Sequence, residues 1–77
     1  MNIYRYSFTC RCPTDKTMVT YHLTIESPTK ILAEDIRAIC AVEEAHQEDL
    51  ADKLIALGGV HSMTATHAGV TIETRRP

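Results

Sequence analysis

The sequence predicts a single small α+β domain with the element order β-β-α(α)-β-β, in which a long helix packs on one face of a four-stranded, mainly antiparallel sheet. Two segments, residues 3–25 and 60–75, are rich in threonine and β-branched residues and alternate apolar with polar side chains, the period of a half-buried strand. Between them, residues 29–57 repeat apolar residues at the helical period of 3.6. The chain of 77 residues is short enough to make one domain, residues 1–77.

The first hairpin rests on a clear alternation of side chains. Its first strand places Tyr4, Tyr6, Phe8, Cys10 and Cys12 on one face and polar residues on the other. Residues 13–16, with one proline and one aspartate, supply turn chemistry. The second strand repeats the alternation with Val19, Tyr21, Leu23 and Ile25. The sequence therefore predicts two antiparallel strands with one buried face.

The helical segment follows residues 27–29, where Ser27 or Thr29 is the expected N-cap, and stops at the glycine pair 58–59. As one straight helix, residues 30–57 would be about 42 Å long. A domain of this size has a radius of gyration of about 11–12 Å, so a straight helix would overhang the sheet. We therefore expect a bend or break at residues 43–47, where the apolar stripe lapses.

The second hairpin is expected at residues 60–66 and 70–74, with a turn at 67–69 and a frayed tail at 75–77. Val70 and Ile72 are its clearest inward residues, whereas residues 60–66 alternate less clearly because Ser62 and Thr64 share the side of Val60. The histidines at 22, 61 and 67 are expected to face outward. The predicted core comprises Tyr6, Phe8, Tyr21, Leu23, Ile36, Ile39, Leu50, Leu54 and Ile72.

Charge and cysteine usage narrow the class of protein. The net charge of −2 divides into +1 for residues 1–28, −4 for residues 29–57 and +1 for residues 58–77. The three cysteines, an odd number, argue against a disulfide framework. The chain opens without the apolar region of a signal peptide and has no apolar run of the roughly 20 residues that a membrane helix needs. We expect a cytoplasmic protein without a membrane partner.

The acidic residues of the helical segment are the first candidate for a binding surface. Glu44, Glu48 and Asp52 follow at four-residue steps opposite the apolar stripe, and Glu34 lies on the same side earlier in the segment. Like charges at this spacing destabilise a helix by a few tenths of a kcal/mol per pair. A sequence that keeps such repulsion is expected to use it against a partner protein with a basic surface.

Two alternative sites use other residues. Arg5, Arg11, Arg75 and Arg76 would contact nucleic acid through the sheet, although the strand aromatics that could stack on bases alternate onto the opposite face. Cys10, Cys12, Cys40 and His46 would serve a small metal-binding or redox protein. A structural zinc site typically uses two cysteine pairs, each spaced by two to four residues, whereas this sequence has one pair spaced by a single residue. We therefore expect the three cysteines to be buried as small apolar residues and expect no cofactor.

No catalytic motif is present: Ser7, Ser27 and Ser62 lack the glycine context of a nucleophile elbow. The sequence therefore favours a non-enzymatic protein-binding module or inhibitor. In size and style only, it is similar to the small counter-defence proteins of phages and mobile elements, such as anti-CRISPR proteins. Two open sheet edges also leave a homodimer among the expected assemblies.

Overall fold

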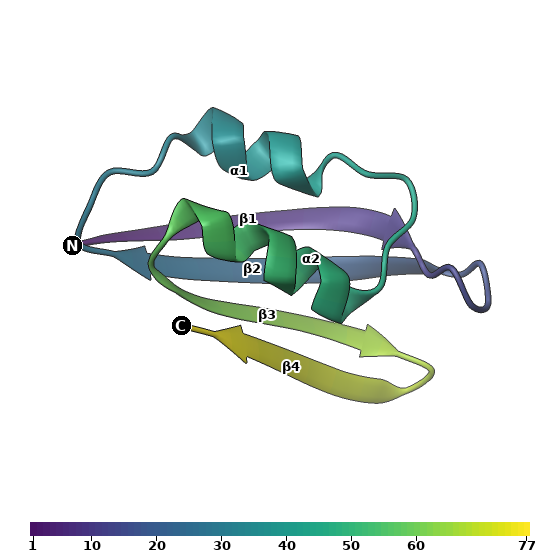
Figure 1. Ribbon diagram of the computed structural model, residues 1–77. Helices are drawn as coiled ribbons and strands as arrows, with labels where there is room; N and C mark the ends of the chain where they lie inside the picture. The colour runs from purple at the N-terminus through teal and green to yellow at the C-terminus, as the bar shows by residue number, and fades with distance from the viewer.

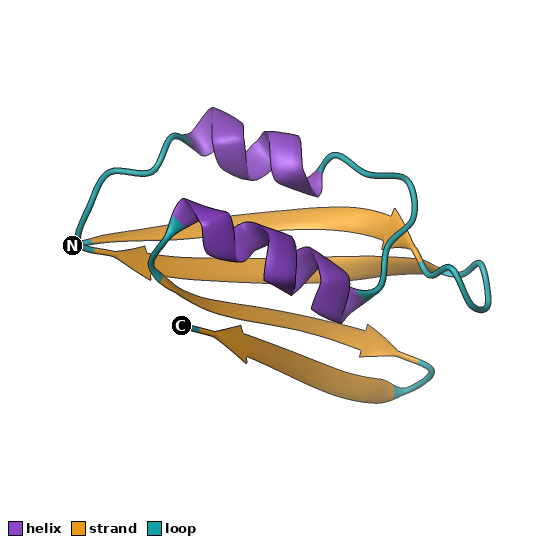
Figure 2. Ribbon diagram, in the orientation of Figure 1, coloured by secondary structure: helices purple, strands orange, loops and turns teal.

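The structure, a computed structural model, describes residues 1–77 and contains one four-stranded antiparallel sheet in the order β1-β2-β3-β4. The elements are β1 (Asn2–Arg11), β2 (Met18–Ser27), α1 (Ala33–Cys40), α2 (Gln47–Leu54), β3 (Val60–His67) and β4 (Val70–Arg76), with one 3₁₀ turn at Ile55–Leu57. Both helices lie on the same face of the sheet (Figures 1 and 2). The predicted α+β class and element order are confirmed.

Each hairpin forms for a local reason. In the first, the aromatic and apolar residues pair across the strands, with Phe8 opposite Tyr21 and Cys10 opposite Val19. In the second, Ala68 and Gly69 form a two-residue turn in which both φ angles are positive, at 52° and 78°. Such a turn matches the right-handed twist of the flanking strands, so it holds the hairpin in register.

The helical segment is broken, as expected, between Cys40 and Gln47. Residues 41–46 run as an extended connection, and Glu44 within it forms an isolated bridge to Arg11 at the end of β1. The predicted N-cap is wrong, because α1 begins after the extended residue Leu32 without a side-chain cap. Ser27 instead ends β2 and accepts a hydrogen bond from the Thr29 amide at 3.2 Å.

The core lies between the helix-facing side of β1, β2 and β3 and the two helices. Of the nine predicted core residues, Tyr21, Leu23, Ile36, Leu50 and Leu54 are buried, and Tyr6, Phe8 and Ile39 are half-buried. Ile72 is 40% exposed, so its assignment to the core is wrong. It shares the face of the buried Thr74, but β4 is an edge strand with a neighbour on one side only.

The predicted outward position of His61 on β3 is also wrong. His61, Met63 and Ala65 are buried, whereas Val60 is 58% exposed. A period of two fits either face, and the choice is made by pairing with β2, where Met63 lies opposite the buried Leu23. His61 enters the interior and donates from Nε2 to the Gly58 carbonyl at 2.6 Å.

The C-terminal tail is part of the sheet. Arg75 and Arg76 complete β4, so the predicted fraying of residues 75–77 is wrong for both arginines. Arg76 turns toward the helices and donates from Nε to Asp52 Oδ1 at 2.8 Å. Val70, predicted to face inward, opens the same strand and is 58% exposed.

Candidate functional site

The largest cleft of the molecule lies at the end of the sheet where the two hairpin turns meet the beginning of α2. The β1–β2 loop, the N-terminus of α2 and the β3–β4 turn come together there (Figure 1). The cleft has a volume of about 530 Å³, and Cys12, Asp15, His46, Glu48 and His67 are among the residues that line it. Titratable side chains from three separate segments of the chain therefore lie around one cleft.

A cluster of three such side chains lies within this cleft. The Cys12 sulfur, an Asp15 carboxylate oxygen and a His67 ring nitrogen all lie within 4.8 Å of one another. Asp15 Oδ2 and His67 Nε2 are 2.8 Å apart, within hydrogen-bonding distance. Cys12 is only 6% exposed. The three residues, named here the Cys12–Asp15–His67 cluster, combine a thiol, a carboxylate and an imidazole.

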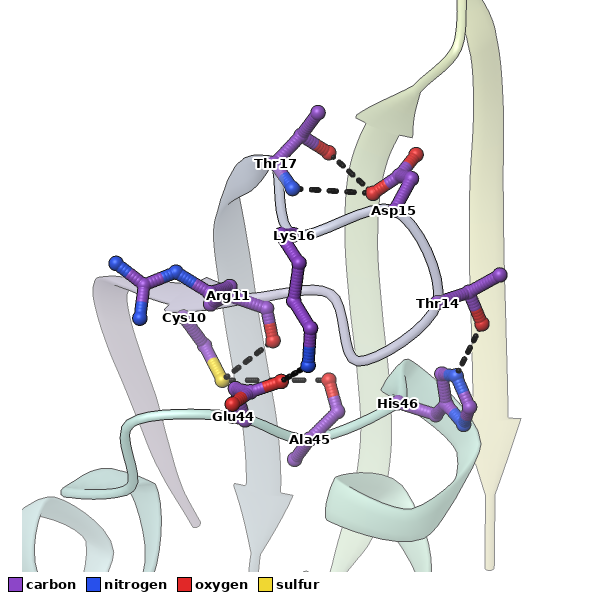
Figure 3. Close-up of polar contacts among 9 residues, drawn as sticks. All are labelled: Cys10, Arg11, Thr14, Asp15, Lys16, Thr17, Glu44, Ala45 and His46. Atoms are coloured by element: carbon purple, nitrogen blue, oxygen red, sulfur yellow. Dashed lines mark hydrogen bonds and ion pairs between the residues drawn. The ribbon is translucent and has the colours of Figure 1, made fainter.

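The β1–β2 loop fixes the carboxylate of this cluster. Thr17 donates to Asp15 Oδ1 from its backbone amide at 3.1 Å and from its hydroxyl at 2.7 Å (Figure 3). The loop is closed by the Cys12 amide donating to the Thr17 carbonyl at 2.8 Å, and Lys16 adopts a positive φ of 65°. The side-chain and backbone hydrogen bonds from Thr17, followed by that from His67, hold the pKa of Asp15 well below its usual range. Asp15 is therefore a carboxylate at neutral pH.

The same loop is clamped to the connection that precedes α2. Lys16 Nζ donates to Glu44 Oε1 at 2.7 Å, and Thr14 Oγ1 lies 3.1 Å from His46 Nε2 (Figure 3). Beneath these side chains, the Arg11 amide donates to the Glu43 carbonyl at 2.9 Å. Two walls of the cleft are thus held together by both backbone and side-chain contacts.

The other two cysteines differ from Cys12. Both Cys10 and Cys40 are buried, at 1% and 3% exposure, and neither lines the cleft. Burial raises the pKa of the Cys10 thiol and raises that of Cys40 to about 11. Among the metal or redox candidates from the sequence, only Cys12 and His46 line the cleft, and only Cys12 belongs to the cluster.

Asp15 and His67 were missed by the sequence reasoning. The sequence predicts only turn chemistry for Asp15 and an outward position for His67, which is half-buried in the structure. A signal is available in the sequence, since Asp15 lies in the first hairpin loop and His67 directly precedes the second hairpin turn. In an antiparallel sheet ordered β1-β2-β3-β4, these two turns fall at the same end.

The acidic residues predicted to bind a partner do not form one helical stripe. Glu34 lies in the first turn of α1, and Glu48 and Asp52 lie on α2. Glu44 is in the connection, where it pairs with Lys16, and Asp52 pairs with Arg76. The four-residue helical spacing is therefore wrong at Glu44, because the helix breaks there. Partner binding by these residues stays a prediction.

The four arginines also fail to share one surface. Arg5 and Arg75 lie in one row across the outer face of the sheet, separated by Thr24 and Ser62, and Arg11 is exposed at the end of β1. Arg75 pairs with Glu73. Arg76 points to the opposite face. Nucleic-acid binding through one surface could therefore use three of the four arginines at most.

Neither helix is long and apolar enough to cross a membrane.

Comparison with known proteins gives one informative result. No protein-family model and no curated protein matches the chain. Among solved structures, it is similar to the crystal structure of the archaeosine synthase QueF-Like in the apo form, with a TM-score of 0.69 and 17% sequence identity. The likeness covers 97% of this chain and 89% of that chain. At this identity the likeness shows the fold alone: the chain has the fold of that synthase.

Proposed function

We propose that the protein binds a small molecule in the cleft and that Cys12 is the reactive group there. The observation that carries the proposal is the Cys12–Asp15–His67 cluster, whose sulfur, oxygen and nitrogen atoms lie within 4.8 Å of one another in the largest cleft of the molecule. A nucleophile, a base and a group that orients the base are the parts that thiol catalysis needs.

In this proposal each of the three groups has one role. His67 accepts the Cys12 proton, and the sulfur forms a bond to an electrophilic carbon of the bound molecule. That carbon gives up one π bond, and the electron pair moves to its heteroatom, which then takes the proton from His67. Asp15, held as a carboxylate by Thr17, orients the imidazole and stabilises its charged form.

The fold comparison agrees with the proposal but identifies no reaction. The similar solved structure is described as an archaeosine synthase, so a domain of this architecture serves an enzyme in at least that protein. A fold hosts many functions, and the argument for catalysis therefore rests on the cluster. The non-enzymatic character favoured by the sequence stays a prediction.

Alkylation of the folded protein by iodoacetamide, followed residue by residue with mass spectrometry, tests the proposal. Cys12 is expected to react first, and Asp15→Asn and His67→Gln to slow its reaction because they remove the base or its orientation. Cys10 and Cys40 are internal controls, since burial raises the pKa of both thiols. Equal rates at all three cysteines in the folded protein would contradict a reactive Cys12.

The acidic surface supports a second proposal, that the protein binds a basic partner protein as a module or inhibitor. Glu34 and Glu48 are exposed and form none of the four ion pairs of the structure. Replacing both with lysine is expected to leave the fold intact and to slow association with such a partner. Unchanged capture of the partner by the folded double variant would reject this surface, and Asp35→Lys, at an exposed acid outside the predicted set, is a matched control. Three free thiols support our further proposal of a cytoplasmic location.

A further inference from the structure

We propose that the Cys12–Asp15–His67 cluster binds one Zn²⁺ ion through three protein ligands and leaves the fourth coordination position open to the cleft. Thiolate sulfur, imidazole nitrogen and carboxylate oxygen are the three donors that zinc takes in proteins. A site with three protein ligands and one open position is the arrangement in which zinc binds a water molecule or a small ligand. We expect a small molecule in the cleft to bind the zinc ion at this fourth position.

The geometry is close to that of a tetrahedral site. Zinc bonds of about 2.0 Å to nitrogen and oxygen and about 2.3 Å to sulfur place tetrahedral ligand atoms roughly 3.3–3.5 Å apart. The three ligand atoms already lie within 4.8 Å of one another, and Asp15 Oδ2 and His67 Nε2 are 2.8 Å apart. On binding, this oxygen and this nitrogen exchange their mutual hydrogen bond for bonds to the metal and separate by a few tenths of an ångström.

The neighbouring residues orient the carboxylate ligand in advance. Thr17 occupies Oδ1 of Asp15 with two hydrogen bonds, which leaves Oδ2 directed at the cluster. Hydrogen bonds of this kind to a ligating carboxylate typically change metal affinity by about 10- to 100-fold. Cys12 is held by its backbone, since its amide donates to the Thr17 carbonyl. Two of the three ligands therefore come from one closed loop.

Zinc binding would act on both stability and reactivity. The ion joins the β1–β2 loop to the β3–β4 turn, two segments that are about 50 residues apart in sequence, so binding stabilises the folded state. Cys12 must lose its proton to bind, so affinity rises with pH. The binding itself does not depend on the thiol chemistry proposed above. A zinc-bound Cys12 sulfur cannot also attack a substrate carbon, so zinc is expected to block the proposed thiol chemistry, and this part of the inference rests on the proposed function.

Titration of the full chain with Co²⁺, a spectroscopic substitute for Zn²⁺, provides the test. We expect saturation at one ion per chain, an ultraviolet cobalt–thiolate charge-transfer band, and displacement of that band by Zn²⁺. Cys12→Ser is expected to abolish the band and lower affinity more than about 100-fold, beyond the range for neighbouring groups. Thr17→Val is expected to lower affinity by about 10-fold. Cys40→Ser and His46→Gln are matched controls and should bind as the parent does.

The outcomes separate the metal site from the proposed function. Binding without a thiolate band, equal binding by Asp15→Asn and His67→Gln, or no saturable binding by a folded parent protein would each overturn the zinc site. The iodoacetamide rate of Cys12 in metal-free protein tests the thiol proposal independently. A rise in melting temperature with Zn²⁺ in the parent and its absence in His67→Gln support the cross-link between the two turns.

Discussion

Gln47 and Met63 are joined by a hydrogen bond of 2.9 Å from the Gln47 side-chain Nε2 to the Met63 carbonyl. The same nitrogen donates to the Ile72 carbonyl at 3.1 Å. Because Gln47 is the first residue of α2, one amide fastens the start of this helix to both β3 and β4. Gln47 lines the cleft, and its hydrogen bonds hold the neighbouring residues His46 and Glu48 in place beside it.

Gln47→Leu keeps the size of the side chain and removes its donor. Two carbonyls lose a partner, so we expect the free energy of unfolding to fall by about 1–2 kcal/mol, measured by urea denaturation. Glu48→Leu at the neighbouring exposed position is the control and is expected to change stability by less than about 0.5 kcal/mol. Equal losses in the two variants would contradict the role of the amide.

Leu50→Ala removes a side chain with no exposed surface from the centre of the core. We expect a loss of about 2–5 kcal/mol, from lost burial and the cavity left behind. Small domains have roughly 5 kcal/mol of total stability or little more, so this variant is expected to melt near or below room temperature. Ile55→Ala is the aliphatic control, because Ile55 is 42% exposed. Similar melting temperatures for Leu50→Ala and the parent would refute the buried face of α2.

The adjacent glycines that follow the last helical turn offer a matched pair. Gly58 and Gly59 have φ values of 77° and 79°, so alanine at either position costs about 1–3 kcal/mol for an unfavourable positive-φ backbone. A Cβ on Gly58 would meet nothing within 4 Å, whereas a Cβ on Gly59 would lie 2.7 Å from the Glu26 carbonyl oxygen. Gly59→Ala should therefore be the less stable variant by a further 1–3 kcal/mol or so. The reverse order in thermal melts would show that the contact with β2 is wrong.

Acid should weaken the contribution of Asp15. Its pKa in the folded protein lies below the ordinary value of 3.8, chiefly because Thr17 hydrogen-bonds to the charged form. The fold therefore favours the carboxylate: this stabilisation is fully present above about pH 4 and is lost as the pH falls further. The difference in unfolding free energy between the parent and Asp15→Asn should be constant near neutrality and shrink below about pH 4. Asp49→Asn, at an exposed position of α2, is the control, and a constant Asp15→Asn difference in acid would contradict the assignment.

The sequence by itself determined the fold class, the strands of both hairpins and the position of the helix break. These features depend on local pattern. Alternation of side chains from Tyr4 to Cys12 has only one reading as secondary structure, and an unbroken helix over residues 30–57 is too long for the sheet beneath it. The burial of Leu50 and Leu54 follows from the same helical period.

Only the tertiary structure decided which face of β3 is buried and which side chains meet in the cleft. Alternation allows either face, and pairing of Met63 with Leu23 chooses between them. Ile72 has a suitable side chain and the inner face, but an edge strand leaves it exposed. Asp15 and His67 are 52 positions apart and meet because the sheet order brings both hairpin turns to one end. Local sequence encodes period and turn chemistry, whereas a contact between distant side chains depends on strand order and on what covers each face.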